Sequence, residues 1–271
     1  MSILGPQSIT MQPTTIEEVL TRLTAIINDS INSNSRAGYF AALYYKVTYS
    51  VQQGIANNQF EDGPRMEQLD VTFANRYLTA YDQWKNKQPM TASWQVAFET
   101  VEKRSALVLQ HLFLGMNAHI NLDLGIAAVE TMQGKEFVKL CNDFNTINAI
   151  ISSLTNQVIA ELDRISPLLS LLGFHATRNN SILIQFSIDC ARDGAWRFAE
   201  ELSQLSGTAY DQCIADRDKG IGQLGQTLVQ GSTLLKLTIW FIHLWEWKQP
   251  SRIIKVMHEA KKQYLKVAEM E

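Results

Sequence analysis

Hydrophobic residues recur three and four positions apart along nearly the whole chain, which is the spacing of an amphipathic α-helix. No stretch alternates convincingly between apolar and polar positions, and no hairpin turn lies between β-branched runs. The pattern predicts an all-α fold: a single compact domain over residues 14–271, with eight or nine helices around a central buried helix. Residues 1–13 are expected to form a flexible N-terminus. The helices are expected near residues 14–29, 39–57, 64–85, 92–132, 136–165, 181–205, 209–229, 233–247 and 252–270.

Short motifs at the ends of these segments support the boundaries. The Thr-x-x-Glu pattern at Thr14 and Thr15 is typical of a capping box at the start of a helix. Asp62-Gly63-Pro64 predicts a turn followed by a helix start, because proline is tolerated in the first helical turn. Gly134 and the pair Ser166-Pro167 are typical helix ends.

The segment from Ala106 to Val129 is almost entirely apolar, yet it contains an imidazole and a carboxylate four residues apart. On an α-helix His119 and Asp123 lie about 40° apart and share one face. His111, Gly115 and Glu130 lie near that face, and Gly115 leaves room for a ligand or another backbone. Asn117 and Asn121 lie on the opposite face, where we expect them to form hydrogen bonds between helices.

An ionisable group inside an apolar helix is costly unless it is paired, bound to a metal or used chemically. Two interpretations of His119 and Asp123 therefore stay open. The pair is either a metal site or an acid–base pair in a pocket, or it is a buried ion pair that locks two helices together.

Three further groups are weaker candidates. Asp189, Asp193, Trp196 and Glu200 share one helical face beside Arg192, a pattern typical of a metal or proton-transfer site and also of a solvated ion-pair ladder. Asp70 stands among apolar residues and is a candidate third metal ligand, although acidic residues on helices are usually solvated. His243 lies among Trp240, Trp245 and Trp247, a spacing typical of the core and also of a pocket wall.

Composition narrows the class of protein. The net charge is -3 and no basic cluster is evident, so nucleic acid is not an expected partner. Three cysteines cannot all pair and none is in a Cys-x-x-Cys spacing, which indicates a reducing compartment. The N-terminus lacks a signal peptide, and the apolar stretch 234–247 is too short and too charged to span a membrane. We expect a soluble, cytoplasmic protein, and a homo-oligomer is left open. Motifs of nucleotide-binding and di-iron proteins are absent.

Several blocks of the sequence resemble an uncharacterised bacterial family, domain-of-unknown-function family 5995. The central block is His111-Leu-Phe-Leu-Gly-Met-Asn-Ala-His119-Ile-Asn-Leu-Asp123-Leu. The likeness extends from Arg36-Ala-Gly-Tyr-Phe40, through Phe60 to Asp70 and Phe73-Ala-Asn-Arg-Tyr77, to Arg192-Asp-Gly-Ala-Trp196. It covers most of the chain but implies no established activity.

Gly115 followed by His119-x-x-x-Asp123 is also similar to the helical metal motif of zinc-dependent phospholipase C and P1-type nucleases, which are all-α. Those enzymes place another histidine soon after the aspartate, where this chain has Leu124-Gly-Ile-Ala-Ala128. They also use an N-terminal tryptophan as a ligand, whereas this chain begins Met-Ser-Ile-Leu. The likeness therefore implies one metal ion or none, rather than three zinc ions.

Together these observations predict an enzyme that acts on a small, partly apolar molecule in a pocket lined by the central helix. In a metal-dependent hydrolase, His119, Asp123, His111 and Asp70 would hold one divalent ion (zinc, iron or manganese) and activate a water molecule. In a metal-free enzyme, Asp123 would orient His119, which transfers protons. The candidate catalytic residues are His119, Asp123, His111, Arg192 and Asp193.

Two alternatives stay open. One is a metal-free cyclase or isomerase that uses aromatic walls together with Asp189 and Asp193 to stabilise cationic intermediates. The other is a non-catalytic helical binding protein in which the His119–Asp123 pair is structural.

Overall fold

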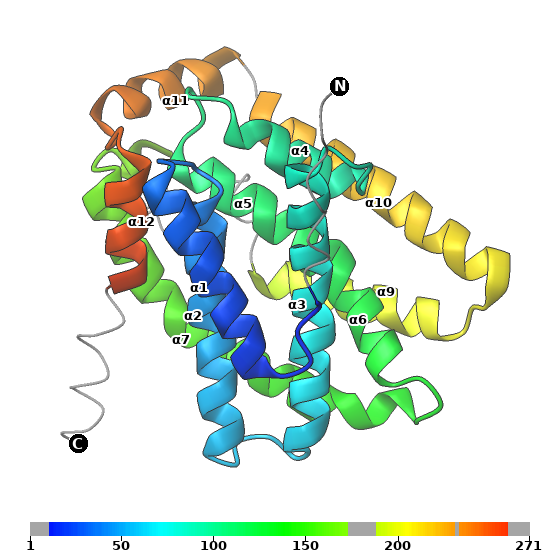
Figure 1. The fold of residues 1–271 in the computed structure, drawn as a ribbon. Helices are drawn as coiled ribbons and strands as arrows, with labels where there is room; N and C mark the ends of the chain where they lie inside the picture. Colours follow the sequence, from blue (N-terminus) through cyan, green and yellow to red (C-terminus); the bar gives the residue numbers. More distant parts are fainter. Residues whose placement is uncertain (1–10, 173–187, 231–232, 260–271) are drawn as a thin grey trace, which may run out of the picture.

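The apolar periodicity of the sequence becomes helix throughout the described chain. The computed structural model describes residues 11–172, 188–230 and 233–259, and within these ranges it contains 11 α-helices and no strand. The all-α prediction is confirmed (Figure 1). The α-helices are α1 (Ile16–Asn32), α2 (Gly38–Ala56), α3 (Gly63–Lys85), α4 (Ala92–Val101), α5 (Val108–Ala118), α6 (Leu124–Thr131), α7 (Cys141–Ile165), α9 (Ile188–Ser203), α10 (Gly207–Gln230), α11 (Thr233–Trp245) and α12 (Pro250–Glu259). Three short elements complete them: the π turn η1 (His119–Asp123) and the 3₁₀ turns η2 (Phe137–Leu140) and η3 (Leu169–Leu172).

The predicted helix ends are largely those observed. Thr15 caps α1 by accepting a hydrogen bond from the Glu18 backbone N–H, and the Glu18 carboxylate accepts in return from the N–H of Thr14, one residue before the cap. Asp62 caps α3 in the same way, accepting from the Arg65 N–H. Helix α7 ends at Ile165, immediately before Ser166-Pro167. Parts of the predicted helices at 181–205 and 252–270 lie outside the described residues.

The single long helix expected over residues 92–132 is wrong, and this break is one reason for the larger number of helices. The chain leaves the helix between Val101 and Val108, where it reads Glu-Lys-Arg-Ser-Ala-Leu. Leu107 is extended, and its N–H donates to the Gln110 side chain, which caps the following helix. From Val108 to Thr131 the elements α5, η1 and α6 form one continuous central helix.

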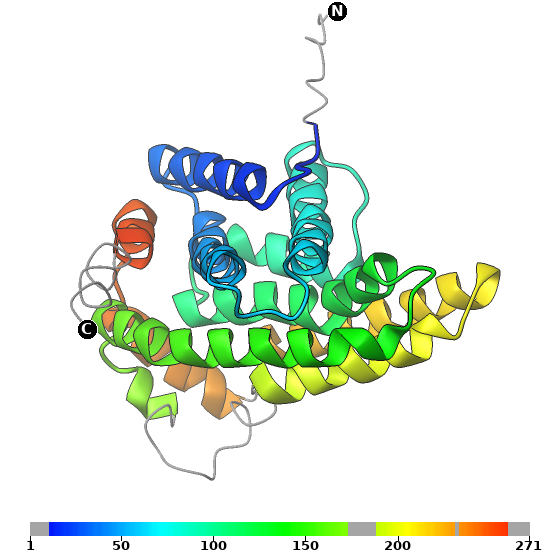
Figure 2. The same ribbon diagram turned by 90° about the horizontal axis from the view of Figure 1, so that it is seen from below.

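The central helix lies inside the bundle. It contacts α2, α3, α4, α9 and α10. Figure 2 shows α2 and α3 end-on, between α1 on one side and α7 on the other. Val108–Thr131 is the one helix in the described ranges that is long and apolar enough to cross a membrane. Of its most apolar 18-residue stretch, 83% is buried inside the fold. A buried core helix has the same composition.

The polar face formed by Asn117 and Asn121 packs against α10, and the predicted side-chain bond between helices is made by Asn117. Asn117 donates to the backbone oxygen of Ile221 on α10 at 2.9 Å, and Asn121 donates to Asn117 at 3.1 Å. Arg217 of α10 donates in turn to the backbone oxygen of Asn121. These bonds set the position of α10 on one side of the central helix, so the face that carries His119 points elsewhere.

Gly115 allows a ring, and not a backbone, to approach the central helix. A Cβ atom built on Gly115 would lie 2.5 Å from Cγ of Phe40, a buried residue of α2. The glycine therefore sets how closely α2 packs on α5.

We predict that Gly115→Ala lowers the free energy of unfolding by about 1–3 kcal/mol, since the added methyl group must displace a buried ring. Gly220→Ala is the matched control, because a Cβ atom at this position of helix α10 would have no other atom within 4 Å. The control should raise stability by about 0.5–1 kcal/mol through helix propensity. Urea unfolding of both variants measures the difference. A Gly115→Ala variant as stable as the control would show that Phe40 has room to move.

Candidate functional site: a buried histidine held by a shared carboxylate

Asp123 is the centre of a buried polar cluster on the central helix. Its carboxylate accepts hydrogen bonds from Trp94 Nε1 at 2.8 Å and from Arg76 Nε at 3.1 Å, and its Oδ2 lies 3.1 Å from His119 Nδ1. The donors come from α4, α3 and the central helix itself. Asp123 is only 1% exposed. A carboxylate this deep in the protein is stabilised by such donors.

His119 and Asp123 are the first and last residues of the π turn η1. A π turn inserts an extra residue into the helical ladder, and such turns are frequent at functional sites. Here the turn lies in the middle of an otherwise regular helix. It places the imidazole and the carboxylate within hydrogen-bonding distance on one side of that helix.

Aromatic rings enclose the imidazole of His119. The Phe73 ring stacks on it with a centroid distance of 3.5 Å and an interplanar angle of 6°. Tyr44 meets it edge-on at 4.5 Å. The rings of Phe40, Trp94 and Tyr77 lie at 5.9, 5.9 and 6.1 Å. His119 is 2% exposed, so this aromatic cage separates it from solvent.

Burial determines the protonation of His119. It lowers the pKa of the imidazole, and the Asp123 carboxylate opposes this effect only in part. The neutral ring carries one proton, which belongs on Nδ1, where the carboxylate accepts it. Nε2 then presents a lone pair, and this atom is buried with no hydrogen-bond partner in the structure.

The hydroxyl groups of two tyrosines in the cage are also buried and unpartnered. They belong to Tyr44 and Tyr77, and burial raises the pKa of both. The Thr48 hydroxyl faces Tyr44 and favours its ionised form, yet the two do not form a hydrogen bond of normal geometry. Both tyrosines are therefore neutral at pH 7 and able to donate.

Asp70 lies on α3, one helical turn from Phe73 and buried beside the same cage. Burial, with a smaller contribution from the charge of Glu67, raises the pKa of Asp70 to about 8. Its Oδ2 has no hydrogen-bond partner. The charge of Asp70 raises the pKa of Tyr44, so the two groups interact.

The predicted metal ligands do not come together as a set. Within residues 11–172, 188–230 and 233–259, no three His, Cys, Asp or Glu side chains form a group that could hold a metal ion. His119 and Asp123 are adjacent, but Asp123 is already occupied by protein donors. His111 packs edge-on against Tyr39 at 5.4 Å, and burial lowers its pKa to about 3.

The residues predicted on α9 lie apart from this cluster. Arg192 is buried, donates to the backbone oxygen of Phe144 on α7 and lies over the Phe144 ring. Asp193 is exposed, and the side chain of Asp189 lies outside the described residues. Trp196 donates to Glu200 within the same helix.

Sequence reasoning missed the two donors Arg76 and Trp94 in the cluster, and Tyr44 in the aromatic cage. Arg76 had one signal, its place in the Phe73-Ala-Asn-Arg-Tyr77 block. No sequence signal marked Trp94 or Tyr44 as a site residue. Each lies on a helix with apolar periodicity, so an aromatic residue there is expected simply as part of the core. Glu130, predicted on the face of His119, joins the cluster through Arg76, which lies 3.5 Å from it.

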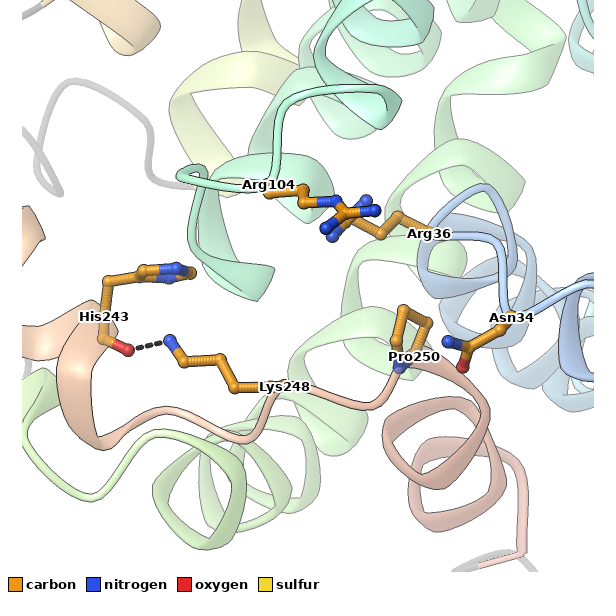
Figure 3. A pocket seen from close by; sticks show the side chains of 6 residues that line it. All are labelled: Asn34, Arg36, Arg104, His243, Lys248 and Pro250. Atoms are coloured by element: carbon orange, nitrogen blue, oxygen red, sulfur yellow. Dashed lines mark hydrogen bonds between the residues drawn. The ribbon is translucent and has the colours of Figure 1, made fainter.

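Arg36 lines two cavities, one of which borders the cage. The first is a crevice with room for about 20 Å³, lined by Phe40, Tyr77, Trp94 and His111 among others. Three of these rings belong to the cage around His119. The second cavity holds about 420 Å³ and is lined by Asn34, Arg36, Arg104, His243, Lys248 and Pro250 (Figure 3). His243 thus lines a pocket, whereas Trp240 and Trp245 are 57% and 65% exposed and do not belong to the core.

Comparison with known proteins identifies a family but no activity. A protein-family model described as "Family of unknown function (DUF5995)" matches residues 16–231. No curated protein and no solved structure matches the chain. The resemblance seen in the sequence blocks is therefore confirmed, and nothing extends the short likeness to phospholipase C.

The raised pKa of Asp70 predicts a specific dependence of stability on pH. Asp70 keeps its proton up to about pH 8 in the folded protein and loses it near pH 4 in the unfolded chain. Between these values the folded state binds more protons, so the free energy of unfolding falls as pH rises, by at most about 1.4 kcal/mol per pH unit. The lowered pKa values of His111 and His119 act in the opposite direction, but only below about pH 6.5.

Asp70→Asn should therefore flatten the fall in stability between about pH 6.5 and 8. Denaturant unfolding at several pH values measures this slope. Glu99→Gln removes a solvent-exposed carboxylate on α4 instead of a buried one and should keep the wild-type slope. If Asp70→Asn also kept that slope, Asp70 would not be the group responsible.

Proposed function

Because the chain belongs to DUF5995, a family of unknown function, we propose from its site alone that it is an enzyme that moves a proton on a small, partly apolar molecule. The observation that carries this proposal is the pair of nitrogens of His119. Nδ1 is held by Asp123, while Nε2 is buried, unprotonated and without a partner. An unsatisfied buried polar atom costs about 1–3 kcal/mol, and a native fold that retains one calls for an explanation.

In this mechanism His119 is the catalytic residue. Nε2 accepts a proton from a C–H or O–H bond of the substrate, and the electron pair of that bond stays on the substrate. The imidazolium that forms is stabilised by Asp123 through Nδ1–H. His119 then returns the proton to a different atom, which completes an isomerisation, or to a leaving group. No net charge is left on the enzyme.

Asp123 is a positioning residue. Trp94 and Arg76 hold its carboxylate at 2.8 and 3.1 Å, so it cannot turn away from the imidazole without losing both bonds. This arrangement selects the tautomer that leaves the lone pair on Nε2. The neutral Tyr44 and Tyr77 hydroxyls are the donors in reach of the cage that could bind a developing negative charge.

The aromatic cage limits what can react. The crevice beside Phe40, Tyr77 and Trp94 has room for about 20 Å³, which is close to the size of one water molecule. A larger molecule reaches His119 only when one or more of these rings rotate. The apolar walls suit a substrate that is itself partly apolar, and they exclude bulk water from the proton transfer.

A metal-dependent hydrolase, one form of the function expected from the sequence, is less well supported by this geometry. Catalytic zinc sites use three protein ligands, and His119 Nε2 offers one. Arg76 places a positive charge on Asp123, where a metal ion would have to bind. Elemental analysis tests this version. One zinc, iron or manganese ion per chain, lost in His119→Ala, would overturn the metal-free mechanism.

A non-catalytic role is the second candidate, and one observation favours it. The donors to Asp123 come from α3, α4 and the central helix, so the cluster also joins three parts of the fold. In a purely structural cluster, loss of His119 would break a buried pair and cost about 3–5 kcal/mol. In an active site, replacement of the unsatisfied imidazole by an apolar ring costs little.

We therefore predict that His119→Phe changes the free energy of unfolding by less than about 1 kcal/mol, or raises it. The new ring keeps the stacking on Phe73, and Asp123 keeps Trp94 and Arg76 as donors. Asp123→Asn is the contrasting variant and should lose about 3 kcal/mol or more, since three donors depend on the carboxylate. Chemical denaturation measures both. A loss of 3 kcal/mol or more in His119→Phe would assign the pair to the polar core.

Activity is tested by proton NMR in D₂O with three classes of small, partly apolar compounds: esters, lactones and enolisable ketones. Hydrolysis appears as new products, and proton abstraction from carbon appears as deuterium incorporation. His119→Phe should slow any conversion by about 10²- to 10⁴-fold. His258→Gln, on α12 outside the cluster, is the matched control and should retain the wild-type rate. Wild-type rates in His119→Phe, or conversion of none of the three classes by the wild-type protein, would contradict the proposal.

A further inference from the structure

We propose that the cavity of about 420 Å³ between Arg36, Arg104, His243 and Lys248 is a binding site for an oxyanion, the phosphate or carboxylate group of a small molecule (Figure 3). This inference goes beyond the proposed function, because it requires no chemistry at His119. The volume of this cavity lies within the range typical of small-molecule pockets.

Four separate segments of the chain build the cavity. Arg36 precedes α2, and Arg104 lies in the break between α4 and α5. His243 comes from α11, and Lys248 from the short link to α12. In Figure 3 the side chains of Arg36 and Arg104 extend toward each other, and His243 and Lys248 lie across the cavity from them. Basic groups from distant parts of the sequence thus converge on one space.

Among the described residues, none forms a salt bridge with the arginine and lysine side chains of the cavity. Within the described ranges neither Arg36 nor Arg104 forms an ion pair, and the polar contact of Arg36 is a hydrogen bond to the Val101 backbone oxygen at 3.3 Å. Glu246 is a buried acidic residue that contacts the cavity residue His243. It accepts from the Val108 N–H and the Ser166 hydroxyl, and its Oε2 lies 3.6 Å from His243 Nδ1.

Among the described residues, two guanidinium groups and an ammonium group line the cavity, and no acidic side chain does. Two arginines and a lysine give this lining a positive formal charge. Like charges that converge on a partly enclosed space repel, and a bound anion converts this repulsion into attraction. The planar guanidinium fork matches the two oxygens of a carboxylate or a phosphate.

The wall of the cavity also suits an attached organic group. Arg36 lines both this cavity and the aromatic crevice. An anion bound at Arg36 would therefore contact a side chain that also lines the aromatic crevice. The site is therefore better suited to an anionic group carried by a partly apolar molecule than to a highly polar polyanion.

Calorimetric titration and thermal unfolding test the site with two probes, inorganic phosphate and benzoate, each against sodium chloride at equal ionic strength. We expect saturable binding with a Kd of about 1 mM or tighter for at least one probe, and a matching rise in Tm. Stronger binding of phosphate would indicate a phosphate-bearing ligand, and stronger binding of benzoate a carboxylate. Saturation by neither probe beyond the chloride control would overturn the proposal.

Variants distinguish the cavity from general electrostatic attraction. Arg104→Gln should weaken binding at least about tenfold, since it removes one of the two guanidinium groups. Lys103→Gln is the matched control, because it removes the same charge one residue away and does not line the cavity. Equal losses in the two variants would show nonspecific screening and refute the site.

The proposal is independent of the proton-transfer function. His119→Phe should bind the probes as the wild-type protein does, because His119 does not line the cavity. Loss of anion binding in Arg104→Gln with His119 chemistry intact, or the reverse in His119→Phe, would separate the two sites. Arg104 is exposed, so its substitution is not expected to affect folding.

Discussion

The need to satisfy one buried carboxylate organises the middle of this fold. Asp123 is surrounded by apolar side chains, and a bare charge there would cost several kcal/mol. Three donors remove that cost, and each carries a structural consequence. Trp94 holds α4 against the central helix, Arg76 holds α3, and His119 is held within the π turn. The helices could shift relative to one another only by breaking these bonds.

The same carboxylate gives His119 its chemical character. Because Nδ1 faces Asp123, the free lone pair lies on Nε2, and because the cage excludes water, the ring stays neutral. A structural role for Asp123 and a catalytic role for His119 are therefore compatible. The carboxylate is fully used in packing, whereas one atom of the imidazole is not used by the fold at all.

Local spacing explains what could be predicted from the sequence. Helix ends at Thr15 and Asp62 follow from capping motifs, and the packing role of Asn117 and Asn121 follows from their common face. The break after Val101 was missed because Glu102 to Ser105 are compatible with a solvated helical turn, so periodicity alone does not interrupt the helix. Trp94 and Arg76 were missed because they reach Asp123 across 29 and 47 residues of sequence. Contacts between residues so far apart in the sequence cannot be predicted from local spacing.

The break between α4 and α5 connects the two sites. It allows α4 to fold back along the central helix, which brings Trp94 to Asp123. It also places Arg104 at the edge of the larger cavity, while Arg36 donates to the carbonyl of Val101, the last residue of α4. If the chain were helical from 92 to 132, neither arrangement could form, since Trp94 would lie far along the helix axis from Asp123, about 1.5 Å for each residue between them. The segment that periodicity could not identify is thus the one on which both the aromatic cage and the basic cavity depend.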